Sequence, residues 1–186
     1  MRERNITMSL TKDKIIKGET ALKKILGVKS VMALPRIIKV VVSVGVGKMR
    51  EKKQLELIAD RLAKITGQKA VPRGAKKSVA SFKVRQGETV GMMITLRGSR
   101  MWGFLDKLFN VAVPRMRDFR GFSEASVSDS GTLSLGFREH TIFPETSDED
   151  LKDVFGVGIT ITTTAKNSDE GQAYLEYLGV PFKKSS

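Results

Sequence analysis

Four segments of the chain alternate apolar residues with small or polar ones, the pattern of β-strands that bury one face. They are residues 36–46, 89–97, 132–138 and 157–165. In the first segment, the even positions from 40 to 46 are all valine, whereas the odd positions include Lys39, Val41 and Ser43. We therefore expect a sheet with one apolar face that is covered by helices.

The opposite face of these strands carries mainly threonine, serine, glycine, lysine and arginine, and none of the four segments contains aspartate or glutamate. A face of small, hydroxylated or basic residues can lie close to a sugar-phosphate backbone without charge repulsion. The alternative is an ordinary solvated sheet face, which is common in antiparallel sheets. The pattern favours the first interpretation and leaves the second open.

Between the strands, apolar residues recur at intervals of three and four, as they do on one side of an amphipathic helix. The predicted helices are residues 13–26, residues 51–66, a segment from a Ser99 cap to Pro114, and a last helix ending near Gly179. Ser147 and Ser168 each precede an acidic turn, which is typical of a helix start.

Helices and strands follow one another irregularly, which predicts an α+β fold rather than alternating βαβ units. We expect a mainly antiparallel β-sheet with helices packed on one face and the other face open for RNA. Residues 1–12 are polar and predict a flexible N-terminal extension. The predicted helices and strands follow it, with a mobile basic loop at about 72–87.

The charge of the chain narrows the class of partner. The 186 residues have a formal net charge of +13. Residues 1–140 carry a net charge of +17, whereas residues 141–186 carry −4. Such a basic body is typical of proteins that bind nucleic acid or an anionic membrane surface. No apolar run approaches the roughly 20 residues of a membrane span, so no membrane partner is expected.

The composition also excludes several kinds of chemistry. The chain has no cysteine, which removes disulfides and thiolate metal sites and fits a reducing, cytoplasmic compartment. Its one histidine, His140, has no acid-base partner in the sequence and is interpreted as structural. GVGKM at 45–49 lacks the glycine and the Ser or Thr of a phosphate-binding loop. No catalytic residue, cofactor or metal site is predicted, and the chain is not expected to be an enzyme.

Two further charged segments have competing interpretations. The acidic stretch at 145–153 is interpreted as a capped helix start, with a contact surface as a possible second role. The stretch VPRMRDFRGF at 113–122 places arginines among Phe119 and Phe122. We expect the phenylalanines to anchor this loop, while its arginines contact RNA or pair with Asp118.

The basic segment at 67–87 reads GQKAVPRGAKKSVASFKVRQG and contains six Lys or Arg but no acid. Surface loops are usually mixed in sign, so a solvated charged loop is the weaker interpretation. Its glycines and Pro72 disfavour a regular helix. A cationic loop that becomes ordered on a phosphate backbone is the preferred hypothesis.

Several long motifs resemble one known family. They are the basic segment above, TLRGSRMWGFLDKLFNVAVPRMRDFRGF, LGFREHTIFPE and GITITTTAKNSDEG. Together they resemble bacterial-type large ribosomal subunit protein five, the 5S-rRNA-binding protein of the central protuberance. The resemblance runs from about residue 13 to 184 and implies that residues 13–184 form a single α+β RNA-binding domain. Organelle ribosomes contain similar proteins, so the resemblance fits a cytoplasmic or an organelle ribosome.

The resemblance implies that polar residues of the first strand and of the GQK and TLR motifs bind 5S rRNA. Gln68 and Thr95 match two of these positions, whereas Ser43 stands where the family usually has asparagine. The VSDSGTLSLG stretch also lacks the arginine and the aromatic residue of the family pattern. The full set expected to bind rRNA is Arg36, Lys39, Ser43, Gln68, Lys69, Thr95 and Arg97.

The resemblance also implies further partners: 23S-type rRNA, neighbouring large-subunit proteins, P-site tRNA and a small-subunit head protein. The head protein would form an intersubunit bridge near residues 138–153 and the preceding arginine-rich loop. The tRNA would be contacted by the basic loop through Arg73, Lys76, Lys77, Lys83 and Arg85. The alternative function is a free-standing RNA-binding chaperone that uses the same basic surface.

Overall fold

The computed structural model describes residues 10–47, 52–116, 119–146 and 154–183. These residues form an α+β fold, as predicted. Its helices are α1 (Leu10–Leu26), α2 (Lys52–Thr66), α3 (Gly98–Lys107) and α4 (Ser168–Leu178). A π-helical turn at Leu108–Ala112 extends α3 towards Pro114.

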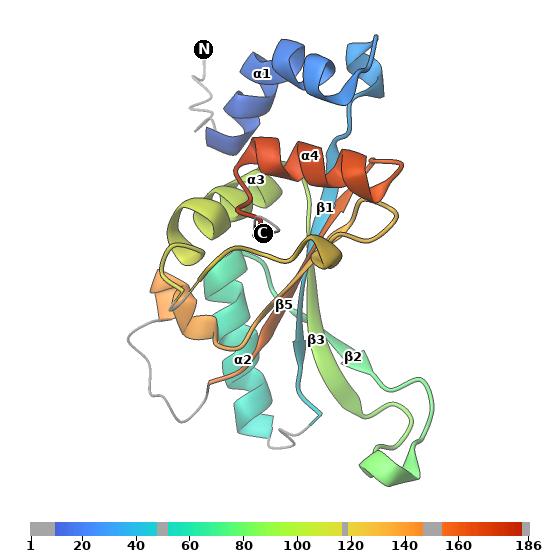
Figure 1. Ribbon diagram of the computed structural model, residues 1–186. Helices are drawn as coiled ribbons and strands as arrows, with labels where there is room; N and C mark the ends of the chain where they lie inside the picture. The colour runs from blue at the N-terminus through green and yellow to red at the C-terminus, as the bar shows by residue number, and fades with distance from the viewer. Residues whose placement is uncertain (1–9, 48–51, 117–118, 147–153, 184–186) are drawn as a thin grey trace, which may run out of the picture.

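One antiparallel sheet forms the centre of the molecule. Its strands are β1 (Ile37–Gly45), β2 (Val71–Gly74), β3 (Thr89–Leu96), β4 (Leu133–Phe137) and β5 (Val157–Thr163). They lie in the order β2-β3-β1-β5-β4, and every neighbouring pair is antiparallel. In Figure 1, α2 and α3 lie on one side of the strands, and α1 and α4 lie towards one end.

The apolar face of the sheet forms the core. Val40 pairs with Leu96 on one side and with Ile161 on the other, and Leu133 continues the row onto β4. All four side chains are fully buried. Helices α2, α3 and α4 supply the other side of this core through buried residues such as Leu62 and Leu105. The predicted alternation of the strands is therefore confirmed.

Helices α1 and α4 pack closely because of a glycine. A Cβ atom added at Gly18 would overlap the ring carbon Cζ and the hydroxyl of Tyr177. The Tyr177 hydroxyl donates a hydrogen bond to the carbonyl oxygen of Lys14, at 3.4 Å. Glycine is a poor helix former, and here the close contact between the two helices explains its place in the middle of α1.

The helix ends differ from prediction in places. Helix α1 begins at Leu10, three residues before the predicted start. The Ser99 cap is wrong: α3 begins at Gly98, and Arg97 occupies the N-cap position without a side-chain hydrogen bond. Helix α4 ends at Leu178, close to Gly179 as predicted, and Gly179 caps it in a left-handed conformation. Ser147 and most of the acidic stretch lie outside the described residues.

The basic segment contains structure that the sequence analysis did not predict. Residues 71–74 form β2, which pairs with β3 through Val71–Met93 and Arg73–Gly91. We refer to residues 71–88, which comprise β2 and its connection to β3, as the finger. Figure 1 shows it projecting from the sheet, with the short helical turn Ala80–Phe82 at its tip. Backbone hydrogen bonds between Val79 and Val84, at 3.0 and 3.2 Å, close the tip.

Candidate nucleic-acid interface

The second face of the sheet presents small and hydroxylated side chains in rows that cross the strands. One row runs Thr95–Val41–Thr160–Ser134, and the next runs Val71–Met93–Ser43–Gly158–Gly136. The residues of both rows are exposed or half-buried. The five strands contain no aspartate or glutamate. We refer to this surface as the open face.

Two of the three polar residues singled out by the resemblance, Ser43 and Thr95, lie close together on the open face, and the third, Gln68, contacts the backbone of β3 at Thr95. Ser43 pairs with Met93, so Thr95 lies diagonally across from it on the neighbouring strand. Gln68 follows the end of α2, where Gly67 has a φ of +68° and turns the chain back. The Gln68 side-chain amide donates a hydrogen bond to the backbone oxygen of Thr95, at 3.4 Å. The candidate rRNA-binding residues therefore come from the loop after α2 and from strands β1 and β3.

The Ser43 hydroxyl donates a hydrogen bond to the backbone oxygen of Gly158 on the adjacent strand, at 3.4 Å. A Cβ added at Gly158 would lie 3.0 Å from this hydroxyl oxygen. The side chain therefore lies flat across β5, and glycine at 158 leaves it the space to do so. Small residues at this position let a ligand approach the backbone of the sheet closely.

The expected rRNA-binding cations surround the same end of the sheet. Lys39 is half-buried and pairs with Thr162, whereas Arg36, Lys69 and Arg97 are exposed. The Arg97 guanidinium donates a hydrogen bond to the backbone oxygen of Ile38, at 3.4 Å, which holds it across the start of β1. The Arg36 guanidinium lies 3.6 Å from the sulfur of Met32. The open face thus combines a neutral centre with positive charge near one end.

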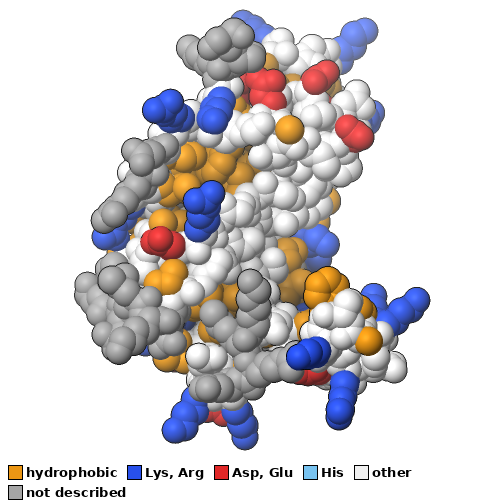
Figure 2. All heavy atoms as spheres, turned by 60° about the horizontal axis from the view of Figure 1, so that its bottom comes forward, with side chains coloured by type: hydrophobic (Ala, Val, Ile, Leu, Met, Phe, Trp, Pro, Cys, Tyr) orange, Lys and Arg blue, Asp and Glu red, His pale blue; other side chains and the backbone are white. Residues whose placement is uncertain are grey.

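The finger carries five exposed cations, which are Arg73, Lys76, Lys77, Lys83 and Arg85. The finger also contains one acid, Glu88 at its base, whose carboxylate accepts a hydrogen bond from the Arg85 backbone amide at 3.0 Å. Figure 2 shows Lys and Arg side chains projecting in several directions from this lobe at the lower right. Lys83 and Arg85 line a shared hollow with Ser78 and Glu88, and the finger carries its cations on a protruding surface.

The arginine-rich loop is anchored by aromatic packing. The rings of Phe119 and Phe122 lie edge to face with centroids 4.8 Å apart, and Phe122 contacts Phe137 of β4 at 6.3 Å. Phe122 also exchanges backbone hydrogen bonds with Pro181 and Lys183, both at 2.8 Å. The predicted anchoring is confirmed, because both rings pack against the core. Asp118 lies outside the described residues.

His140 lies away from the open face. It is buried, and its ring stacks on Phe155 with centroids 4.1 Å apart. Its Nδ1 atom lies 3.4 Å from the Phe155 backbone amide, and its Nε2 atom lies 3.4 Å from a guanidinium nitrogen of buried Arg61. These contacts fit the structural role predicted for it.

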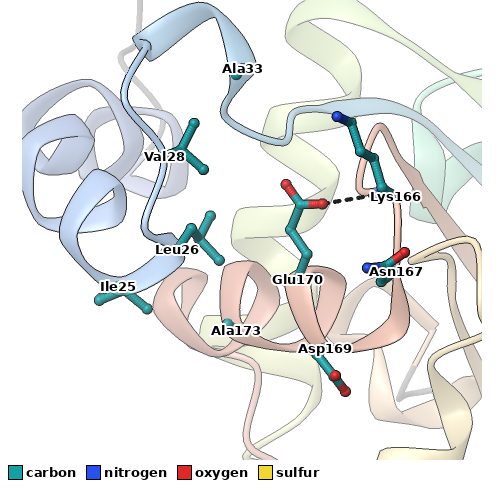
Figure 3. Close-up of a pocket in the computed structure, with 9 residues that line it drawn as sticks. All are labelled: Ile25, Leu26, Val28, Ala33, Lys166, Asn167, Asp169, Glu170 and Ala173. Carbon is teal, nitrogen blue, oxygen red and sulfur yellow. Dashed lines mark hydrogen bonds between the residues drawn. The ribbon is translucent and has the colours of Figure 1, made fainter.

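One hollow of the described surface lies between the end of α1 and the start of α4 and is lined by aliphatic side chains and by Lys166, Asn167, Asp169 and Glu170 (Figure 3). There the Glu170 carboxylate accepts a hydrogen bond from the Lys166 backbone amide, at 2.9 Å, whereas Asp169 points away. Within the described ranges, no group of three His, Asp or Glu residues could hold a metal ion. None of the described helices is long and apolar enough to cross a bilayer.

The fold adds further candidates to the residues predicted from the sequence. Thr160 and Ser134 complete the row that Thr95 begins, and their alternation was visible in the sequence. The aromatic Phe82 at the fingertip was also missed, although it is 75 % exposed. An exposed aromatic among cations is a sequence signal for nucleic-acid contact only once its exposure is known.

The chain is similar in sequence to known proteins over most of its length. Residues 30–85 match the family model described as ribosomal protein L5, and residues 89–182 match the model for the C-terminus of the same ribosomal family. A protein of Ureaplasma urealyticum named large ribosomal subunit protein uL5 is 46% identical over 176 residues, 94% of each chain. Proteins with the same name from Thermoanaerobacter and Anaeromyxobacter are 46% and 44% identical, over 88% and 92% of this chain and 92% and 95% of theirs.

Proposed function

The chain belongs to the ribosomal protein L5 family of the large ribosomal subunit, and from this premise we propose that its open face binds 5S rRNA. The family is a structural component of the cytoplasmic bacterial ribosome and is not enzymatic. Its partners are rRNA and other ribosomal proteins. We further assign a partner to each surface of the protein.

The carboxylate-free open face is the observation that carries the proposal. Ser43 and Thr95 lie near one another on the open face, Gln68 contacts the backbone of Thr95, and Arg97 lies across the start of β1 near Lys39. Neutral donors and acceptors can hydrogen-bond sugars and base edges, while the surrounding cations attract phosphates. Such a surface would bind 5S rRNA in the central protuberance. The edges of the same surface would contact 23S-type rRNA.

The finger and the arginine-rich loop serve different partners in this proposal. The finger would contact P-site tRNA, because its exposed cations stand clear of the sheet. The region near residues 138–153, together with Arg115 and Arg120, would contact a head protein of the small subunit. Arg115, Arg120 and Arg138 are exposed or half-buried, and 147–153 lie outside the described residues.

Titration of 5S rRNA with the purified protein tests the open-face assignment. If six to ten phosphates are contacted, affinity should fall about 10³- to 10⁵-fold between roughly 50 and 200 mM salt. Gln68→Ala and Thr95→Ala should each weaken binding about 2- to 10-fold, the effect of one neutral hydrogen bond. Gln54→Ala on α2, which covers the other face of the sheet, is the matched control.

Binding of 5S rRNA that does not change with salt would contradict the proposal. The chaperone alternative makes a different prediction, since a chaperone binds many RNAs with its basic surface. Displacement of 5S rRNA by an equal concentration of an unrelated structured RNA would favour the chaperone, whereas preferential retention of 5S rRNA supports the proposed function.

A further inference from the structure

The fingertip has a defined conformation, although it projects from the sheet. The Ala75 amide donates to the Glu88 backbone oxygen at 2.9 Å, and the Gln86 amide donates to the Ser78 hydroxyl at 2.9 Å. Together with the Val79–Val84 pair, these bonds join the two arms from base to tip. Such a tip loses less conformational entropy on binding than a disordered loop.

An unusual backbone conformation sets the direction of the tip. Lys83 has a φ of +52° and is the one non-glycine residue with positive φ among those the structure describes. It ends the turn Ala80–Phe82, and its amide donates to the Ala80 oxygen at 3.0 Å. This left-handed conformation is unfavourable for a residue with a side chain, and such outliers cluster at functional positions.

An aromatic side chain is presented at this turn. Phe82 is 75 % exposed, and Val79 close to it is 41 % exposed. Lys76, Lys77, Lys83 and Arg85 surround them in sequence, and all four are exposed. In Figure 2, hydrophobic atoms are visible on this lobe among the blue cationic side chains. The tip therefore offers both an aromatic surface and positive charge.

We propose that Phe82 is a stacking platform for an exposed nucleobase of the RNA that the finger contacts. Nucleic acid combines the two groups that this tip would recognise, since it carries phosphates for the lysines and flat aromatic bases for the ring. Bases inside a duplex are already stacked, so the partner base lies in a loop or at the end of a helical stack. This inference rests on the proposed function, which makes that RNA a tRNA.

Large subunits reconstituted with variant protein test the proposal through equilibrium binding of tRNA. Phe82→Leu keeps an apolar side chain of similar size but removes the aromatic surface. It should weaken tRNA binding about 5- to 100-fold, the value of one base stacked on an aromatic ring. Phe82→Trp should preserve or strengthen binding, because indole also stacks.

The salt dependence separates stacking from charge. Phe82→Leu should leave the slope of log affinity against log salt unchanged, because it removes no ion. Lys77→Gln should lower the magnitude of that slope by about 0.7 to 0.9, the effect of one lost phosphate contact. Equal tRNA binding by the Leu, Trp and parent proteins would overturn the stacking proposal. If Lys77→Gln still reduced the slope, the proposed tRNA contact would stand without it.

A fluorescence measurement identifies the ligand directly. The chain has a single tryptophan, Trp102, so Phe82→Trp combined with Trp102→Phe places the only indole at the tip. Other proteins of the subunit also contain tryptophan, so the emission of the tip is the difference between subunits reconstituted with this variant and subunits reconstituted with Trp102→Phe alone. Stacking on a base should quench this difference when tRNA is added. Unquenched emission with tRNA would overturn the proposal. So would a blue shift with vesicles of phosphatidylserine and phosphatidylcholine alone, since it would identify the tip as a membrane contact.

Discussion

The open face and the finger are both poor in acids, but they are built in different ways. The open face belongs to the central sheet, and the residues at its centre are fixed by pairing on both sides and by the buried core behind them. The finger is held by β2 and by hydrogen bonds within its own arms. One surface therefore inherits the stability of the whole domain, whereas the other can change without unfolding it.

This contrast predicts that the two surfaces can be inactivated separately. The largest effect is expected on the open face, where Thr160 lies in the row with Thr95. Thr160→Glu should weaken 5S rRNA binding about 100-fold or more, because a carboxylate would face phosphates at close range. Thr160→Gln introduces a side chain of the same shape as glutamate but without its charge, so it should weaken binding much less. Gel-shift titration at one fixed salt concentration measures both.

The second prediction concerns the finger. Lys76→Glu combined with Lys77→Glu should weaken tRNA binding to reconstituted subunits about 10- to 100-fold, since it converts two attractive contacts to repulsive ones. The same variant should bind isolated 5S rRNA as well as the parent protein does. An equal loss of tRNA binding and of 5S rRNA binding would mean that the open face and the finger contact the same RNA. The two surfaces would then not be separable.

The third prediction sharpens the view of the finger as a folded unit. Lys83→Val should add about 1–2 kcal/mol to the cost that lysine already bears in this conformation, because a β-branched side chain is even less tolerated at positive φ. This corresponds to about 5- to 30-fold faster hydrogen exchange of the Val79 and Val84 amides. Lys83→Gly removes the same cation and relieves that cost, so these amides should be at least as protected as in the parent. Similar exchange in the two variants would show that the conformation does not order the tip.

The smallest effect is expected at Ser43. Ser43→Asn introduces an amide that can donate and accept hydrogen bonds together. Because one additional neutral bond contributes about 1 kcal/mol, 5S rRNA binding should tighten by about 5-fold. Unchanged thermal stability is the control. Weaker binding would mean that the flat position of the serine across Gly158 is itself needed.

The regular strands could be predicted because their alternation is local and strong. The valines at positions 40, 42, 44 and 46 define a buried face whatever they pair with. Strand β2 could not be recognised this way, because VPRG contains proline and glycine and does not alternate. It is a strand because β3 lies beside it, with Val71 opposite Met93. A strand that forms because a neighbouring strand pairs with it need not show the alternation or the residue types of a strand in its own sequence.

Long-range contacts explain the remaining differences. Glycine is unfavourable within a helix, and the place of Gly18 in α1 is explained by its close contact with Tyr177, which lies far along the chain. The hydrogen bonds that order the finger, such as Gln86 to Ser78, have no recognisable spacing in the sequence. For the candidate site, the resemblance supplied Gln68 and Thr95, but their direct contact appeared only with the fold.

The central position of β1 has a consequence for synthesis of the protein. Its two edges pair with β3 and with β5, and β5 ends at Thr163. At translation rates of about 5–20 residues per second, a nascent chain that has completed β3 must wait several seconds before β5 emerges. During that interval one edge of a valine-rich strand lacks its neighbour, and part of its apolar cover is missing. A released fragment ending before Val157 should therefore aggregate, which light scattering would detect, whereas the full chain should not.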